Sequence, residues 1–314
     1  HIIDPWTTPL AFAHEAVANG TVPRLGASVI GADIGAEVTT LDTTAGPVRA
    51  RYVVNAGGLG GDILHRAFGF DGFTIRPRRG ELIVFDKLAR PLVRRTILPV
   101  PTSVTKGVLV APTVFGNVML GPTADDIDDR QATATTGDGL SGLLDKGRRI
   151  VPHLLDHEVT ATYAGLRAAT EHSDYVLTHD ATARYVCLGG IRSTGLSASM
   201  ALAEVALDRL RACGLDPAPK DPAELVAVRL QPLGEAGDRP YLHGGRVVCH
   251  CEKVTESEIT GACSGPLPAV DLDGIRRRTR ALAGRCQGFH CLADVVGCAA
   301  RADGRSASTW MGLP

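Results

Sequence analysis

Residues 184–214, RYVCLGGIRSTGLSASMALAEVALDRLRACG, decide the fold class of this chain. An apolar run ends at Gly189 and Gly190, and from Ser197 apolar residues recur at helical spacing until Gly214. The pattern predicts a strand, a glycine turn and a long helix. Such a turn allows a ligand to approach the backbone, and the helix N-terminus offers N–H groups to an anion. An ordinary glycine-rich connection has the same spacing and stays open as an alternative.

The residues before this stretch continue the α/β pattern. Residues 7–21 predict a helix, and residues 27–43 and 46–58 predict β-branched strands joined by a hairpin turn around residues 45–47. The run RYVVNAGG at 51–58 is almost entirely apolar, which predicts a strand buried on both faces. Residues 59–69 then predict a short helix.

A different pattern occupies the middle of the chain. Residues 73–87, 95–101 and 107–123 are alternating or apolar runs with Pro and Gly at the breaks, which predicts an antiparallel sheet. Residues 137–155 predict a helix, and residues 160–170 predict a further strand. We therefore expect an α/β (α+β) protein with an inserted antiparallel-sheet domain. The predicted division is 1–72, 73–165, 166–213, a Pro-rich linker at 214–241 and a small helical domain at 242–314.

Composition excludes several classes of protein. A chain of 314 residues suggests about two domains. The formal net charge of −1 gives no general attraction to nucleic acid. We find no apolar run long enough to cross a membrane and no signal peptide, so the predicted compartment is the cytoplasm. The start at His1 rather than Met is compatible with a fragment.

Four cysteines form two close pairs near the end of the chain. Cys249 and Cys251 form a C-x-C pair, and Cys286 and Cys291 form C-x4-C. Four thiolates suit either Zn²⁺ or an iron–sulfur cluster. Structural zinc modules favour C-x2-C, so the spacing favours a [2Fe–2S] cluster, with zinc and plain burial as alternatives. The single cysteines, which are predicted to be buried, are Cys187, Cys213, Cys263 and Cys298.

The motifs VCHCEKVTESEI and GIRRRTRALAGRCQGFHC carry a resemblance over residues 247–296. They resemble the bacterioferritin-associated-ferredoxin-like [2Fe–2S] module found at the C-terminus of certain FAD-dependent dehydrogenases. The resemblance implies that the cluster ligands are Cys249, Cys251, Cys286 and Cys291. His250 stands where that family often has Arg, which leaves the ligand count unchanged.

Residues 1–213 carry a second resemblance through the phrases RYVVNAGGLGGD, IRPRRGELIVFD, YAGLRAAT and GGIRSTGLSASMALAEVALDRL. Their order is similar to that of the D-amino-acid-oxidase-like flavoproteins, nearest to glycerol-3-phosphate dehydrogenases and L-2-hydroxyglutarate oxidases. The resemblance implies a Rossmann-like FAD domain. The implied FAD contacts are Val29, Asn55, Ala56, Gly57, Gly58, Gly189, Gly190, Ile191, Gly195 and Leu196.

The dinucleotide fingerprint G-x-G-x-x-G, which should open such a flavoprotein, is absent from the sequence. The stretch GGLGGDI does not supply it, because Ile63 occupies the third glycine position. We therefore expect the N-terminal part of the FAD unit to be missing from this chain, and FAD binding by the chain itself to be weak.

The resemblance implies that Arg167 faces the substrate anion. A guanidinium suits carboxylate or phosphate, whereas the alternative is a surface arginine in a salt bridge. Arg192, beside the glycine turn, is the second candidate. Arg78 and Arg79 are interpreted as a solvated basic cluster, and Tyr163 as a pocket-lining or packing residue.

These features predict an FAD-dependent dehydrogenase of a small anionic substrate, first of all glycerol 3-phosphate. Electrons would pass through the [2Fe–2S] cluster to a partner subunit or a quinone system, which allows peripheral attachment at the inner face of the cell membrane through a partner. Alternative substrates are an L-2-hydroxy acid such as 2-hydroxyglutarate, or an amino acid or amine. Two hypotheses of other classes are a zinc-stabilised regulatory protein and a noncatalytic electron-transfer subunit.

Overall fold

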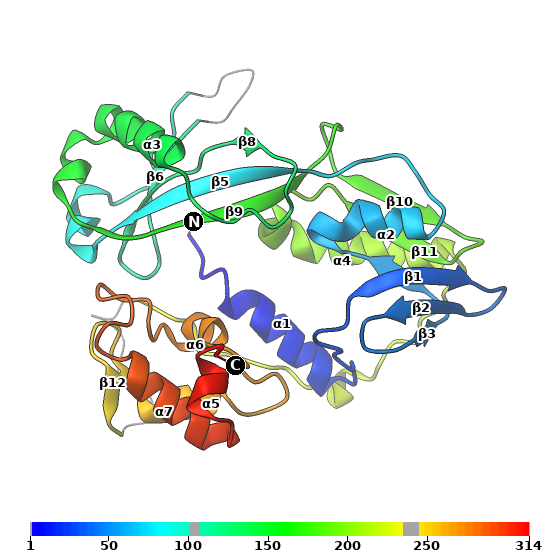
Figure 1. Ribbon diagram of the computed structural model, residues 1–314. Helices are drawn as coiled ribbons and strands as arrows, with labels where there is room; N and C mark the ends of the chain where they lie inside the picture. The colour runs from blue at the N-terminus through cyan, green and yellow to red at the C-terminus, as the bar shows by residue number, and fades with distance from the viewer. Residues whose placement is uncertain (1, 101–106, 235–244, 314) are drawn as a thin grey trace.

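The computed structural model describes residues 2–100, 107–234 and 245–313, and its elements form three units (Figure 1). We name them the glycine-turn unit (2–72 and 170–213), the sheet lobe (73–100 and 107–169) and the cysteine unit (245–313). Residues 235–241 of the predicted linker and 242–244 of the predicted C-terminal domain lie outside the described residues. Among the described residues, none of the helices combines the length and apolar character needed to cross a membrane.

The glycine-turn unit contains two three-stranded sheets flanked by helices. In the first, the strands β1, β2 and β3 are antiparallel, as the hairpin prediction required. In the second, of order β10-β11-β4, β4 runs parallel to β11 and β10 antiparallel to it. The elements are α1 (Thr7–Ala18), β1 (Val29–Ile34), β2 (Thr39–Thr43), β3 (Val48–Ala50), β4 (Val53–Asn55), η1 (Gly58–Gly60), α2 (Gly61–Ala67), β10 (Val176–Asp180), β11 (Tyr185–Gly189) and α4 (Gly195–Ala212).

One expectation for this unit was wrong. The strand predicted at 51–58 is only the three-residue β4, and Val54 is 41% exposed. The reason is one-sided cover: Val53 and Asn55 are buried on one face of β4, whereas Val54 on the other face is not covered by the described residues. An apolar run in sequence therefore did not establish burial on both faces.

The sheet lobe is built on the long strands β5 and β9, which pair antiparallel along their whole length (Figure 1). The other edge of β5 pairs with β7 and β8, and β6 pairs with β7. The helix α3 packs its Leu143 on one face of the sheet. Its elements are β5 (Arg76–Phe85), η2 (Lys87–Leu92), β6 (Leu109–Pro112), β7 (Val118–Gly121), β8 (Asp125–Asp126), α3 (Gly137–Ile150), η3 (Pro152–Asp156) and β9 (Val159–Ala169).

The strand β9 extends past the predicted boundary at residue 165. It ends at Ala169, so Arg167 belongs to the sheet and not to the segment that returns to the glycine-turn unit. Over residues 214–234, the part of the predicted linker that the structure describes, the chain forms one short element, the 3₁₀ turn η4 (Pro222–Glu224).

The cysteine unit is mostly helical and has a core of its own. A capping box of Thr255 and Glu258 starts α5, and the Asp271 side chain caps α6. The helix α6 carries Arg276, Arg277 and Arg278 in its last turn and ends with Arg280 in the left-handed conformation. The elements are β12 (Val247–Cys249), β13 (Val254–Thr255), α5 (Glu256–Ala262), α6 (Leu272–Thr279), α7 (Leu292–Asp303) and α8 (Ala307–Trp310).

Candidate functional site

Arg167 lies on the face of the sheet lobe that α3 does not cover. It pairs directly with Arg78 across the β5–β9 ladder, and Gly165 pairs with Gly80. Paired residues share a face, and side chains two positions apart along a strand return to it. Tyr163 therefore belongs to the same face. The alternate β5 positions, with Ile83 and Phe85, enter the core beneath α3.

Two paired glycines leave room on this face for the Arg167 side chain. A Cβ added to Gly80 would lie 3.0 Å from Nη2 of Arg167, whereas one added to Gly165 would meet nothing within 4 Å. The guanidinium lies across β5, where Nη2 donates to the carbonyls of Thr123 (2.7 Å) and Arg79 (3.2 Å) and Nε donates to that of Arg78 (3.3 Å). In the described chain, Nη1 has no hydrogen-bond partner. The sheet thus holds the guanidinium and leaves one N–H pair for a ligand.

The charge of Arg167 is not neutralised locally. Burial lowers its pKa and the Arg78 charge lowers it further, while Asp125 and Asp126 raise it. Arg78 itself binds Asp126 through two nitrogens, at 2.6 and 2.9 Å. Within the described ranges, Arg167 has no carboxylate partner at salt-bridge distance. The salt-bridge alternative is therefore unsupported, and an anionic ligand would complete the site.

The two predicted glycine segments meet at one edge of a sheet. Because β4 and β11 are parallel neighbours, with Asn55 opposite Cys187, their carboxyl ends lie side by side. This edge is where open α/β sheets bind their ligands. Gly190, with φ +65°, turns the chain there, and Thr194 provides no side-chain cap for α4. The first N–H groups of an 18-residue helix therefore remain uncapped by a side chain near this edge.

Some implied FAD contacts have structural duties of their own. The Asn55 side chain is 1% exposed, donates to the Gly61 carbonyl (2.7 Å) and the Tyr185 hydroxyl (2.8 Å), and accepts from the Gly57 N–H (3.0 Å). It organises the turn from within, so only backbone around it is available to a ligand. Gly189 is required for packing, because an added Cβ would lie 2.7 Å from the Phe73 ring.

The remaining implied contacts are accessible to different degrees. Ala56, Gly57 and Gly58 are exposed, whereas Ile191, Gly195 and Leu196 are half-buried. Val29, on β1, is 37% exposed. The contact of these residues with FAD stays a prediction.

Arg192 connects the glycine turn to the β9–β10 loop. Its Nη2 donates to the His172 carbonyl, and its buried Nε has no partner in the described parts of the chain. Tyr175 of the same loop contacts the Thr194 hydroxyl. The structure, over its described ranges, shows no direct contact between Arg192 and Arg167. Arg192 therefore holds a loop at the turn, and a direct role in binding substrate stays a prediction.

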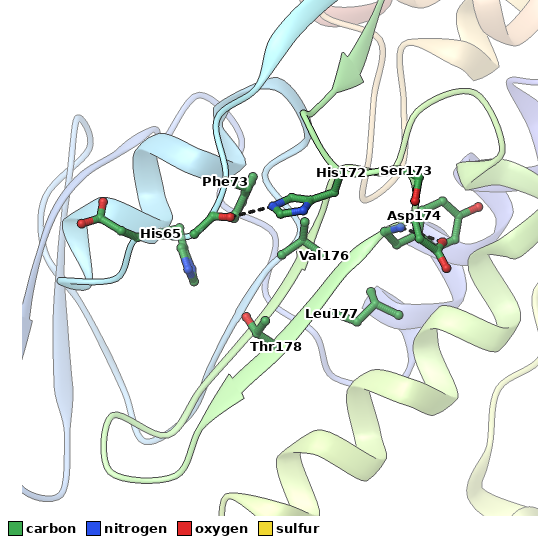
Figure 2. A pocket seen from close by; sticks show the side chains of 11 residues that line it. His65, Phe73, His172, Ser173, Asp174, Val176, Leu177 and Thr178 are labelled. Atoms are coloured by element: carbon green, nitrogen blue, oxygen red, sulfur yellow. Dashed lines mark hydrogen bonds between the residues drawn. The ribbon is translucent and has the colours of Figure 1, made fainter. Parts of the chain in front are cut away.

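A cavity of about 500 Å³ lies beside the glycine turn (Figure 2). The residues around it are His65, residues 71–73 and residues 172–178. His172 closes one side with its Nε2 2.7 Å from the Gly72 carbonyl, and burial lowers the pKa of His65. Neither Arg167 nor Arg192 lines this cavity. His65 and His172 carry no local signal in the sequence, because their contacts join segments about 100 residues apart.

The four C-terminal cysteines come together in two pairs. The Cys251 and Cys286 thiols lie close enough to shift each other's pKa, and the Cys249 thiol shifts that of Cys291. Electrostatic interactions also link Cys251 to Cys249 and Cys291 to Cys286, so the pairs are neighbours. All four are free thiols and not disulfides. Two segments 35 residues apart in sequence, from Cys251 to Cys286, therefore supply one sulfur-rich centre.

The loop after Cys286 favours a thiolate. Burial by itself would raise the pKa of the Cys286 thiol, but hydrogen bonds from the His290, Gly288 and Phe289 backbones and from Cys251 lower it. Burial and the neighbouring Cys249 raise the pKa of Cys291 to about 12. Positive φ angles, uncommon in residues other than glycine, gather around these loops at Lys253, Arg280, Leu282 and Gln287. Such unusual backbone is typical of a site that shapes its loops around a ligand.

Among the described residues, no group of three or more His, Cys, Asp or Glu side chains is arranged to hold a metal ion. A [2Fe–2S] cluster requires something different, since each of its two irons takes two protein ligands. The donor set of two adjacent thiol pairs fits that requirement. His250 and His290 are exposed, and with four cysteines present neither is needed as a ligand.

Comparison with known proteins decides the family. A family model described as FAD dependent oxidoreductase (DAO) matches residues 1–209. The chain belongs to this family of FAD-dependent oxidoreductases. The flavoprotein prediction is thereby confirmed at the level of the family.

This FAD-dependent oxidoreductase is similar to two curated glycerol 3-phosphate dehydrogenases. It is 33% identical to the "Glycerol 3-phosphate dehydrogenase" of Caloramator mitchellensis over 311 residues, which cover 96% of this chain and 64% of the relative. It is 26% identical to one subunit of the "Anaerobic glycerol-3-phosphate dehydrogenase" of Escherichia coli K12, over 91% of this chain and 57% of the relative. The chain thus spans less than two thirds of the length of these relatives.

Among solved structures, the oxidoreductase is similar to the dithionite-reduced L-alpha-glycerophosphate oxidase of Mycoplasma pneumoniae with FAD bound. The TM-score is 0.56 at 27% identity, and the match covers 62% of this chain and 52% of that chain. The mixed α/β fold is therefore that of known FAD-dependent oxidoreductases.

Proposed function

We propose that this chain is the substrate-binding and electron-exit part of a dehydrogenase that oxidises glycerol 3-phosphate. The observation that carries the proposal is Arg167, a cation held by three backbone carbonyls with no carboxylate partner in the described chain. The two curated relatives are named for glycerol 3-phosphate. A guanidinium suits carboxylate as well as phosphate, so an L-2-hydroxy acid is the second candidate.

In this proposal each part of the chain has a physical role. Arg167 binds the substrate anion, and Gly165, where an added Cβ would meet nothing within 4 Å, leaves the sheet face open for the substrate carbon chain. The glycine turn and the N-terminus of α4 lie near the flavin and stabilise the negative charge of its reduced form. When bound, FAD supplies the hydride acceptor. Arg192 positions the loop that borders this turn.

The nucleotide end of FAD needs an element that residues 1–314 do not contain, since the G-x-G-x-x-G fingerprint is absent. We place that element outside this sequence. The free edge of β4, the end strand of its sheet, and the exposed side chain of Val54 support this assignment.

We further propose that Cys249, Cys251, Cys286 and Cys291 hold a [2Fe–2S] cluster. It would carry electrons singly from the flavin to a partner subunit or quinone system. The paired thiols and the N–H groups directed at Cys286 support this, and the match to the Caloramator relative covers 96% of the chain. The Escherichia coli relative is named as one subunit of its enzyme, which supports a partner subunit for this chain. We propose that the enzyme works in the cytoplasm and is attached peripherally at the inner membrane face through that partner.

Absorption and activity test the proposal together. The protein, purified anaerobically with its nucleotide-binding element and FAD, is expected to show flavin and iron–sulfur bands. It should reduce a dye with glycerol 3-phosphate and much more slowly with L-2-hydroxyglutarate. Cluster bands without flavin or dye reduction would instead support an electron-transfer subunit, and a colourless zinc protein would exclude both proposals.

Substitution of Arg167 tests the substrate site. Arg167→Met is expected to lower kcat/KM by about 10²-fold, because a charge-assisted bond to the substrate anion is lost. The matched control is Arg148→Met, which removes an exposed arginine from α3 of the same lobe. Equal kcat/KM values for the two variants would contradict the role of Arg167.

A further inference from the structure

The cysteine unit rests on the end of the sheet lobe through charged residues. A second cavity, of about 260 Å³, lies at this contact. It is lined from the sheet lobe by Asp86, Lys87 and Asn117, and from the cysteine unit by Cys251, Glu252, Gly284 and Arg285. One of the paired cysteines therefore faces the contact between the two units.

Glu252 is the centre of this contact. It directly follows Cys251 and is 1% exposed. Lys87 of the sheet lobe approaches one carboxylate oxygen to 2.8 Å, and Arg280 of the cysteine unit approaches the other to 3.5 Å. A buried carboxylate is stable only when it is paired, so removal of either cation is strongly unfavourable.

Arg280 reaches the sheet lobe as well. Its guanidinium carbon lies 4.0 Å from the centre of the Phe115 ring, which is 8% exposed, in the β6–β7 turn. The left-handed conformation of Arg280, with φ +71°, ends α6 at this point. A cation over an aromatic face gains most when it is shielded from water.

The contact is connected to the cysteine loops by close backbone packing. A Cβ added to Gly284 would lie 2.3 Å from the Cβ of Cys251 and 3.2 Å from the Cγ of Glu252. Gly284 is two residues before Cys286, so both cysteine segments meet beside Glu252. At the rim, Arg285 pairs with Glu158 and lies 3.8 Å from Asp86.

We propose that Glu252, clamped between Lys87 and Arg280, is a positioning residue that seats the cysteine unit on the sheet lobe and fixes the Cys251–Cys286 pair. The consequence for the cluster rests on the proposed function. The contact between the cysteine unit and the sheet lobe is a property of this chain, and it can be tested without a cluster.

Amide hydrogen exchange measures directly how firmly the cysteine unit is held on the sheet lobe. Lys87→Met is expected to raise amide exchange in the peptide around Phe115 and the one around Glu252 by about tenfold or more, because it removes a cation from a buried carboxylate. Lys146→Met, which removes an exposed lysine from α3, is the matched control. Unchanged exchange in Lys87→Met would overturn the proposal.

The exposed ion pair of Arg285 and Glu158, at the edge of the cavity, provides a second test in variants that fold. Arg285→Glu is expected to raise exchange at the same peptides, and the double variant Arg285→Glu with Glu158→Arg is expected to restore it, because both side chains are largely exposed and can exchange charge. Absence of rescue would contradict a contact between the two units that depends on these charges.

The cluster consequence has its own readout. In the iron-loaded protein, Lys87→Met is expected to lose iron to a chelator about tenfold faster than Lys146→Met. Equal rates of iron loss would overturn the positioning of Cys251 and Cys286. If the wild-type protein never binds iron, the proposed function fails. Hydrogen exchange still tests whether Glu252 holds the cysteine unit on the sheet lobe.

Discussion

The cysteine unit and the glycine-turn unit bury their apolar residues very differently. In the cysteine unit, α5, α6 and α7 each bury side chains in one cluster, among them Ile259, Ile275 and Val295, all fully buried. In the glycine-turn unit, α1 buries no residue and α4 buries only Leu202. Ile30, Val54 and Met200 remain 70, 41 and 67% exposed there.

The cysteine unit thus has an apolar core of its own, whereas the glycine-turn unit leaves apolar side chains exposed to solvent. Val54 on β4 and Met200 on α4 are exposed, and exposed apolar side chains that form a patch are typical of an interaction surface. The cysteine unit can therefore be expected to keep its apolar core by itself, whereas the glycine-turn unit is expected to gain order from whatever packs on β4 and α4. Four experiments challenge this comparison, from the largest expected effect to the smallest.

The largest effect is expected from a ligand cysteine. Cys286→Ser should abolish iron and acid-labile sulfide binding, because one of four thiolates is lost. The control Cys298→Ala removes a buried cysteine of the same unit that belongs to neither pair, and should retain full iron content. Iron and sulfide analysis of anaerobic protein decides the outcome, and retention of a full cluster by Cys286→Ser would remove that residue from the ligand set.

Core truncation tests the contrast between the units. Ile259→Ala is expected to lower the free energy of unfolding of the cysteine unit by about 3 kcal/mol, because Ile259 is fully buried. Met200→Ala in α4 should change stability by less than about 0.5 kcal/mol. Denaturant titrations followed by the buried Trp310, in a Trp6→Phe background, report the cysteine unit, and far-ultraviolet circular dichroism of the same samples reports the unfolding of α4. Equal losses from both substitutions would break the comparison.

A polar contact between Arg130 and Asp62, which we call the seam, joins the glycine-turn unit to the sheet lobe. Arg130 binds the buried Asp62 at 2.6 and 2.8 Å and also donates to the Ile75 carbonyl. Burial would raise the pKa of Asp62, but the Arg130 hydrogen bonds prevail and lower it to about 2. The carboxylate therefore stabilises the fold above about pH 4, and this stabilisation is lost as the pH falls toward 2.

We expect the difference in unfolding free energy between wild type and Asp62→Asn to narrow by about 2 kcal/mol between pH 5 and pH 2. Urea titrations at each pH measure it. Asp145→Asn, at an exposed position of α3, is the matched control and should show no such narrowing. A constant difference for Asp62→Asn would mean that the seam does not stabilise the fold.

The smallest effect is expected at the surface of the cysteine loop. Phe289 is 87% exposed between Cys286 and Cys291, so Phe289→Ser should change the unfolding free energy by less than about 0.5 kcal/mol. Trp310 fluorescence during denaturant unfolding measures this. A loss comparable with that of Ile259→Ala would show that the loop depends on a contact made by this ring.

Local signals predicted much of the architecture. The helix at Thr7–Ala18, the hairpin of β2 and β3, and the long helix α4 followed from apolar spacing and glycine positions, which are properties of adjacent residues. The strand at 51–58 was misjudged because burial on a second face depends on neighbours far along the chain. The Arg130–Asp62 seam was missed for the same reason, since 68 residues separate its partners.

The candidate site divides in the same way. By itself, the sequence determined which residues could do chemistry: four thiols in two pairs, an arginine in a strand, and glycines before a helix. Only the tertiary structure decided that Cys251 meets Cys286, that Gly80 makes room for the Arg167 guanidinium, and that Glu252 lies between Lys87 and Arg280. Short-range backbone preferences are written in neighbouring residues, whereas these contacts exist only after distant segments pack together.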